Sequence, residues 1–242
     1  MRILIFSLLF SLISSGCIAE VKLQRVGSTL FHPWGMSLLN DTEALVTERR
    51  GKLFRINLST GERREISNLP KAFTERQGGL LDILVHNPDT PKPDIYFCYS
   101  RHTPNGAATA VNRAVLDGDT LVRQDVIFTA NNSSWDSIHF GCRLAIVNRH
   151  LFVSLGDRGQ RHSAQDGLSH GGSVVRIKLN GTIPDDNHSK ENWLPELLTK
   201  GHRNPQGMAV HPKTDDIWVN EHGPQGGDEI NILQPGENYG WP

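Results

Sequence analysis

Short apolar runs, separated by turn-forming residues, dominate the chain. Many of them hold only four to eight residues, are β-branched or aromatic, and are bounded by Gly, Pro, Asn or Asp, as is typical of β-strands. No stretch of helical length shows a strong 3.6-residue periodicity. The pattern predicts an all-β protein of antiparallel meanders, with strands at residues 44–47, 52–57, 81–86, 94–100, 109–116, 144–148, 151–155, 172–179, 208–211, 216–220 and 229–233.

The order strand, turn, strand, loop, strand is repeated along the chain. Residues 33–56 begin with Pro-Trp-Gly-Met and residues 205–232 with Pro-Gln-Gly-Met, and similar strand runs follow each. Four such units begin near residues 31, 77, 139 and 204, at spacings of 46, 62 and 65 residues. Propeller blades have about 40 to 50 residues, and loop insertions lengthen them. The repeat therefore favours a β-propeller over a β-sandwich, with about four blades in this chain.

The first 19 residues form a separate segment. One Arg is followed by an apolar run through Ile13 and then by small residues, the pattern of a signal peptide cleaved after Ala19. The apolar run is too short to span a bilayer of about 30 Å. A lipoprotein signal is the alternative, in which Cys17 becomes the acylated first residue. Either way the sequence predicts a periplasmic or secreted protein whose residues 20–242 form a partial propeller domain.

The net charge and the cysteine content bear on which partners the protein binds and on whether it holds a disulfide. A formal net charge of -1 gives no electrostatic footprint for nucleic acid or for an anionic membrane. Without the signal segment only Cys98 and Cys142 remain. Export permits a disulfide between them, but each lies in an apolar, strand-like context, which favours two buried free thiols.

Two polar turns near the end of the chain carry candidate chemistry. Arg203 offers a rigid charged fork for a carboxylate or a quinone-like oxygen, and Asn204 adds a donor and an acceptor. Gly223 can take almost any φ and Pro224 has no N–H, so their carbonyls can converge on a hard cation such as Ca²⁺. The alternative is a pair of Gly/Pro-rich turns with a salt-bridged Arg.

Several motifs then carry a resemblance that covers most of the chain. The segments GHRNPQGMAVHP, VNEHGPQGGDEINIL and GENYGWP resemble the soluble aldose sugar dehydrogenases of the glucose/sorbosone dehydrogenase family. Shorter matches occur earlier in the chain, in the order of the family, from about Phe31 onward: HPWGM, QGGLLDI, HFGCRLAI and GDRG. The resemblance implies a six-bladed β-propeller that uses pyrroloquinoline quinone (PQQ) and Ca²⁺. Because two further blades are implied, the chain is interpreted as a truncated member.

The resemblance also implies catalytic roles. His139 matches the catalytic base, and imidazole suits that role because it changes charge near neutral pH. Asp157 would accept the second imidazole N–H and fix the tautomer, and Gln77 would pair with a sugar hydroxyl. The alternatives are a structural or solvent-exposed His, an ordinary turn Asp and a turn amide.

Further matched positions bind cofactors. Arg203 and Asn204 would hold PQQ, together with Ca²⁺ bound through the carbonyls of Gly223 and Pro224. A second, structural Ca²⁺ would use Glu229 and Tyr239, whose alternative is a solvated acidic turn.

The implied reaction is oxidation of an aldose at its anomeric carbon to the lactone, with hydride passing to the quinone. No Gly-rich dinucleotide fingerprint is present, and an external electron acceptor of unknown identity would reoxidise the cofactor. A homodimer is left open. Two other functions also remain: a non-catalytic secreted propeller scaffold, and a Ca²⁺-dependent, lactonase-type propeller hydrolase.

Overall fold

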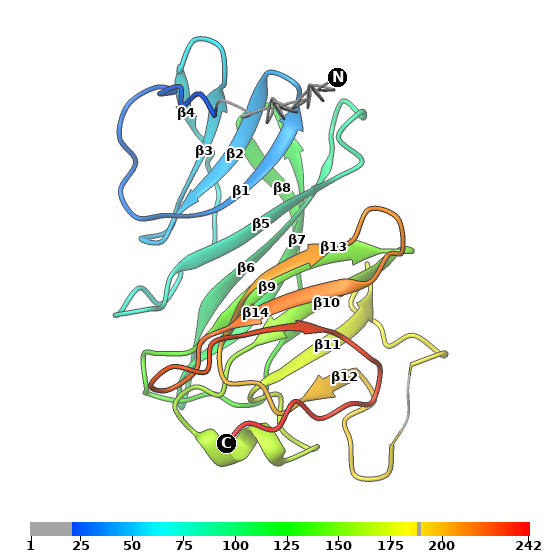
Figure 1. The fold of residues 1–242 in the computed structure, drawn as a ribbon. Coiled ribbons are helices and arrows are strands. Elements are labelled where there is room, and N and C mark those ends of the chain that lie inside the picture. The colour runs from blue at the N-terminus through cyan, green and yellow to red at the C-terminus, as the bar shows by residue number, and fades with distance from the viewer. Residues whose placement is uncertain (1–20, 188–189) are drawn as a thin grey trace, which may run out of the picture.

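The computed structural model describes residues 21–187 and 190–242 (Figure 1). The expected signal peptide and Cys17 lie outside the described residues. Apart from one 3₁₀ turn, η1 (Arg161–Gln165), the regular elements of the described part are all strands. That part holds no helix long and apolar enough to cross a membrane.

Fifteen strands form four antiparallel sheets that follow one another along the chain. The first sheet holds β1 (Pro33–Asn40), β2 (Glu43–Glu48), β3 (Lys52–Asn57) and β4 (Arg63–Glu65). The second holds β5 (Leu80–His86), β6 (Asp94–Thr103), β7 (Gly106–Asp117) and β8 (Thr120–Thr129). The third holds β9 (Gly141–Val147), β10 (His150–Leu155), β11 (Ser173–Lys178) and β12 (Leu197–Lys200), and the fourth β13 (Pro205–Val210), β14 (Ile217–Glu221) and β15 (Glu229–Ile232).

The four sheets are consecutive blades of a β-propeller. Within each sheet the strands pair in chain order, and the first strands of neighbouring sheets contact one another, β1 with β5, β5 with β9 and β9 with β13 (Figure 1). The predicted all-β class and the four blades are confirmed. The apolar runs predicted the middle strands of the first three blades (β2, β6, β7, β10 and β11), because these strands are buried along most of their length.

The sequence pattern did not predict four of the strands, and three of these four are the outermost strands of their blades. β4 is fully polar and exposed, β12 has only four residues, and β8 is interrupted by polar residues where its pairing with β7 shifts register. β1 begins at a Pro and its pairing with β2 is irregular. β4 is exposed and β8 is only partly buried, so neither needs an apolar run, whereas β12 is buried but too short to form a recognisable pattern.

One side chain ties the inner strands of all four blades together. Arg143 of β9 donates to Asp82 of β5 at 2.8 Å and to the carbonyl of Gln206 in β13 at 2.9 Å. Its guanidinium also lies 4.4 Å from the ring centroid of Trp34 in β1. Burial raises the pKa of Asp82, although Arg143 and the N–H of Leu144, 2.8 Å away, favour the charged form. These contacts fix the inner strands relative to one another, and the loops at the ends of the strands are positioned by them.

The cysteine prediction was wrong. Cys98 in β6 and Cys142 in β9 form a disulfide that joins the second blade to the third, with 5.7 Å between the Cα atoms. Both residues are fully buried, as expected, within the apolar cluster between these two blades. The pairing depends on the packing of one blade against the next, which a separation of 44 positions in the sequence does not show.

Candidate active site

A hydrogen-bonded histidine–aspartate pair forms where the third blade begins. His139 lies in the loop that enters β9, and Asp157 follows the end of β10, so the β9–β10 hairpin brings both to one end of the blade. The Nδ1 atom of His139 lies 2.7 Å from Oδ1 of Asp157. Because a carboxylate only accepts, Nδ1 carries a proton, and the neutral imidazole would present its lone pair at Nε2. No hydrogen bond from the described residues reaches Nε2.

Asp157 is held as a carboxylate by three donors. Oδ1 also accepts the N–H of Gly159 at 2.8 Å, and Oδ2 accepts the indole N–H of Trp241 at 2.8 Å. Burial acts to raise the pKa of Asp157, but the hydrogen bonds from His139, Gly159 and Trp241 outweigh it and hold that pKa below its usual value. The carboxylate is therefore charged at neutral pH and fixes the tautomer of His139.

The first glycine of the GDRG turn, Gly156, lets the backbone of that turn pack closely against His139 and Asn204. A Cβ on Gly156 would lie 2.1 Å from the carbonyl oxygen of His139 and 3.0 Å from Oδ1 of Asn204. That Oδ1 in turn accepts the N–H of Gly141 at 3.1 Å. A side chain at position 156 would push the His139 loop away from the loop that precedes β13. Only glycine at this position lets these two loops pack together.

Arg158 supports the His139 loop and was missed by the sequence analysis. It is about 1% exposed, and its guanidinium lies 3.7 Å from the ring centroid of Phe140. It donates to four backbone carbonyls, those of Ala107, Ser134, Asp136 and Ile138. Burial lowers its pKa to about 10. In the sequence it stands inside a turn motif, where nothing shows that its charge is buried.

Gln77 lies beside the candidate base. Its Oε1 accepts the backbone N–H of His139 at 2.7 Å. The side chain is exposed, and its amide N–H groups have no partner among the described residues. The predicted substrate residue therefore both positions His139 and keeps donors available for a hydroxyl group.

A cavity of about 290 Å³ is lined by residues between Gly201 and Pro242, and its lining includes neither His139 nor Asp157. Its lining includes the following predicted cofactor and metal residues: Arg203, Gly223, Pro224, Glu229 and Tyr239. Trp241 lines the cavity too and connects it to Asp157, whose N–H also donates to the carbonyl of Arg203 at 2.9 Å. The guanidinium of Arg203 lies 5.4 Å from the Trp241 ring centroid. Loops from the third and fourth blades thus bring the two predicted groups of residues together.

Asn204 is placed between the two groups rather than in the cavity lining. It is 3% exposed, and its Oδ1 is used by the N–H of Gly141. Its Nδ2 makes no hydrogen bond to the described residues, so one donor is available to a ligand.

The turn at Gly223 and Pro224 offers oxygen atoms of the kind that Ca²⁺ prefers. Neither carbonyl accepts a hydrogen bond from the described residues, and the N–H of Gly223 is held by Asp228 at 2.8 Å, which closes the turn. Glu229 adds a carboxylate to the same cavity. These uncompensated oxygens fit a hard cation. The described residues contain no group of three or more His, Cys, Asp or Glu that could hold a metal ion, so a site here depends on backbone carbonyls.

The Tyr239 hydroxyl already has two backbone partners. It donates to the carbonyl of Ile232 at 2.8 Å and accepts the N–H of Gln234 at 2.9 Å. The ring stacks on His202 with 4.6 Å between centroids. A structural Ca²⁺ at Glu229 and Tyr239 stays a prediction, and the hydroxyl is not a free ligand for it.

A second buried pair, also missed from the sequence, holds the Arg203 turn. His202 is fully buried, with Nδ1 2.7 Å from Oε1 of Glu221. The other oxygen of Glu221 accepts the N–H of Arg203 at 2.6 Å. Both residues stand inside the motifs GHRNP and NEHGP, but their pairing depends on the register of β13 against β14, which the sequence does not give.

Replacing Asp157 by Asn is expected to give a pH-dependent loss of stability. Because the fold lowers the pKa of Asp157, its contribution is fully present above the unfolded-chain value of about 4 and is lost as pH falls through the folded value. Urea unfolding followed by Trp fluorescence should show the variant less stable at pH 7, with the difference shrinking below about pH 4. A difference that stays constant with pH would contradict this. Asp185→Asn is the control, because that side chain is 97% exposed.

The blades and this polar site define a β-propeller protein with a candidate catalytic pair. The family model described as Glucose / Sorbosone dehydrogenase matches residues 30–242, and the chain belongs to this family.

Named relatives agree with the assignment. The chain is 38% identical to aldose sugar dehydrogenase YliI of Escherichia coli, over 93% of this chain and 62% of the relative. It is 29% identical to quinoprotein glucose dehydrogenase B of Acinetobacter calcoaceticus, over 89% of this chain and 51% of the relative. The PQQ-bound aldose sugar dehydrogenase of Streptomyces coelicolor superposes with a TM-score of 0.80 at 28% identity, over 91% of this chain and 65% of that one. The chain thus spans only part of the length of these relatives.

Proposed function

We propose that the protein oxidises an aldose at its anomeric carbon to the lactone, with PQQ as the hydride acceptor and Ca²⁺ as its companion ion. The observation that carries the proposal is the His139–Asp157 pair, with Nε2 open, which Trp241 links to the cavity lined by Arg203, Gly223 and Pro224. Membership of the family supports it, as do relatives whose names include quinoprotein and PQQ-bound.

His139 would take the proton of the anomeric hydroxyl on Nε2. The imidazole then becomes a cation while Nδ1–H still bonds to Asp157, so the buried carboxylate stabilises the charge that forms. Gln77, fixed through Oε1 to the backbone N–H of His139, would orient the sugar with its free amide N–H groups. Trp241 closes the other side of Asp157 and keeps water from its second oxygen.

The cofactor would be held on the other side of the site. Arg203 and the free N–H of Asn204 suit the carboxylates and quinone oxygens of PQQ, and the Gly223 and Pro224 carbonyls suit Ca²⁺. When bound, PQQ supplies an electron-poor carbonyl that takes up hydride, and Ca²⁺ polarises it. An external acceptor would then collect the electrons.

The same proposal includes an exported location, periplasmic or secreted. The Cys98–Cys142 disulfide supports it, because disulfides persist in oxidising compartments. Lipid anchoring at Cys17 and a homodimer stay predictions.

The test is aldose oxidation followed by reduction of an artificial dye. Protein expressed from its complete gene should reduce the dye with glucose or another aldose only after PQQ and Ca²⁺ are both added, and NAD should have no effect. Dye reduction that is unchanged by a chelator and by omission of PQQ would sink the proposal. Absence of any aldose oxidation in the PQQ-loaded protein would favour the non-catalytic scaffold.

A further inference from the structure

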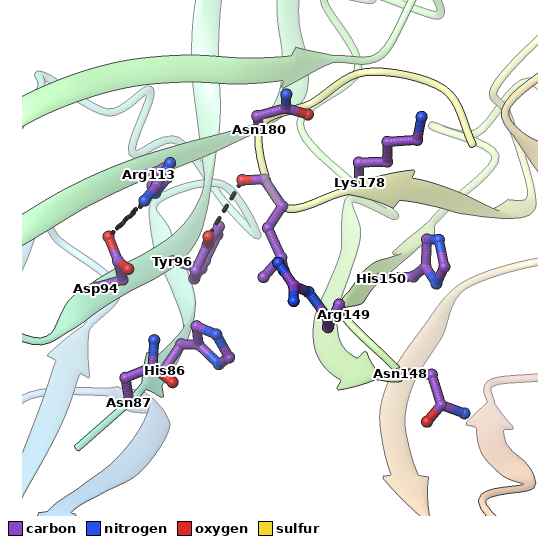
Figure 2. A pocket seen from close by; sticks show the side chains of 11 residues that line it. His86, Asn87, Asp94, Tyr96, Arg113, Asn148, Arg149, His150, Lys178 and Asn180 are labelled. Carbon is purple, nitrogen blue, oxygen red and sulfur yellow. Dashed lines mark hydrogen bonds and ion pairs between the residues drawn. The ribbon is translucent and has the colours of Figure 1, made fainter. Parts of the chain in front are cut away.

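A second pocket, of about 840 Å³, lies between the second and third blades at the opposite end from His139 (Figure 2). Its position follows from the topology: His139 and Asp157 flank the start of β9 and the end of β10, whereas residues 148 and 149 connect the end of β9 to the start of β10. The pocket volume lies within the range of small-ligand sites. The proposed oxidation of aldoses uses none of its residues.

Positive charge dominates this pocket. Among the lining side chains Arg113, Arg149 and Lys178 are cations, and Asp94 is the only carboxylate. Asp94 pairs with Arg113 at 2.9 Å. Lys178 pairs with Asp185, which is 97% exposed and so screens it weakly. Arg149 has no hydrogen bond or ion pair with any described residue. The pocket therefore holds cationic charge that the described residues leave without a buried counter-charge.

The backbone at Arg149 is unfavourable for an arginine. Asn148 and Arg149 form the two-residue turn of the β9–β10 hairpin, with φ of 48° and 63°. Two positive φ values define a type I′ turn, for which Asn-Gly is the preferred pair. Asn148 fits this preference, but the second position holds a side chain where glycine would be unstrained. The arginine at this turn position brings a guanidinium to the pocket, where the preferred glycine would bring no side chain (Figure 2).

Neutral donors and acceptors complete the lining. The side-chain amides of Asn87 and Asn148 have no partner among the described residues. The rings of His86 and Tyr96 lie edge to face, 6.3 Å apart, and the Tyr96 hydroxyl donates to the carbonyl of Leu179 across the blade interface (Figure 2). Amides that can donate and accept suit hydroxyl groups, and an arginine fork suits carboxylate or phosphate oxygens.

We propose that this pocket binds a small polyhydroxylated anion, a sugar acid or a sugar phosphate, with Arg149 contacting the anionic group. Both kinds of ligand carry an anionic oxygen group on a molecule rich in hydroxyl groups, and the experiment below compares them. Isothermal titration calorimetry at low ionic strength would use gluconate, glucose 6-phosphate and neutral glucose. At least one anion should bind saturably and more weakly as salt is added, whereas any binding of glucose, which the His139 site is proposed to take, should not depend on Arg149.

Arg149→Gly is the decisive variant, because it restores the preferred Asn-Gly turn. Its thermal stability should be unchanged or higher, while the anion binds about tenfold more weakly or worse. The matched control is Arg123→Gly, because Arg123 is an exposed arginine with a φ of 50° that does not line the pocket. This control should retain wild-type affinity. The proposal is overturned if neither anion binds, or if Arg149→Gly binds the anions as tightly as the wild type.

Discussion

Replacing His139 by Asn is expected to lower kcat for aldose oxidation by about 10²- to 10⁴-fold, with KM changed much less. The reason is the open Nε2, which has no replacement as a proton acceptor among the groups bonded to Asp157. Asn is chosen because residue 139 has a φ of 51°, a conformation that Asn tolerates better than most residues. The measurement is steady-state kinetics with PQQ and Ca²⁺ saturating.

The matched control for this variant is His32→Asn. His32 is exposed and has a φ of 50°, so the substitution repeats the backbone situation without touching the site. Its turnover should equal that of the wild type. Near-normal turnover of His139→Asn would instead make His139 a structural residue, and the role of Asp157 as its orienting partner would fall with it.

Removing the Cys98–Cys142 disulfide is expected to lower the free energy of unfolding by about 4 kcal/mol. The bond closes a loop of 44 residues, and this estimate follows from the conformational entropy that such a loop loses in the unfolded chain. For a chain of this size that corresponds to a fall in Tm of about 8 to 16 °C. Thermal unfolding of the Cys98→Ala/Cys142→Ala variant, measured by circular dichroism, checks the prediction.

Reductant provides the internal control for the disulfide. It should lower the Tm of the wild type toward that of the double variant and should leave the variant itself unchanged. Equal Tm values for wild type and variant, with or without reductant, would mean that packing between the second and third blades holds the interface without the bond.

The repeated motifs made the blades and half of the site predictable. The first and fourth blades begin with similar motifs, and all four units repeat the same order of strands and turns, so the chain order predicts successive meanders. His139 and Asp157 are 18 positions apart and flank one hairpin, which returns the chain to the same end of the blade. Local sequence was sufficient here because the contacts are local.

The rest depends on contacts between blades, which the sequence does not show. Cys98 meets Cys142, and Trp241 reaches Asp157 from 84 residues away, only after the blades have packed. Arg158 was missed because its burial is created by the loop that it holds. The exposed β4 was missed for the opposite reason, since it has no buried face to impose a pattern.

The central claim, that the cavity linked to Asp157 through Trp241 holds PQQ with Ca²⁺, is tested most directly by titrating PQQ into protein expressed from its complete gene and following its absorbance. We expect saturable binding that requires Ca²⁺ and is lost with a chelator. Arg203→Met should weaken it about tenfold or more, because a charged donor to the cofactor is removed. PQQ binding that is absent, or that is unaffected both by the chelator and by Arg203→Met, would contradict the account.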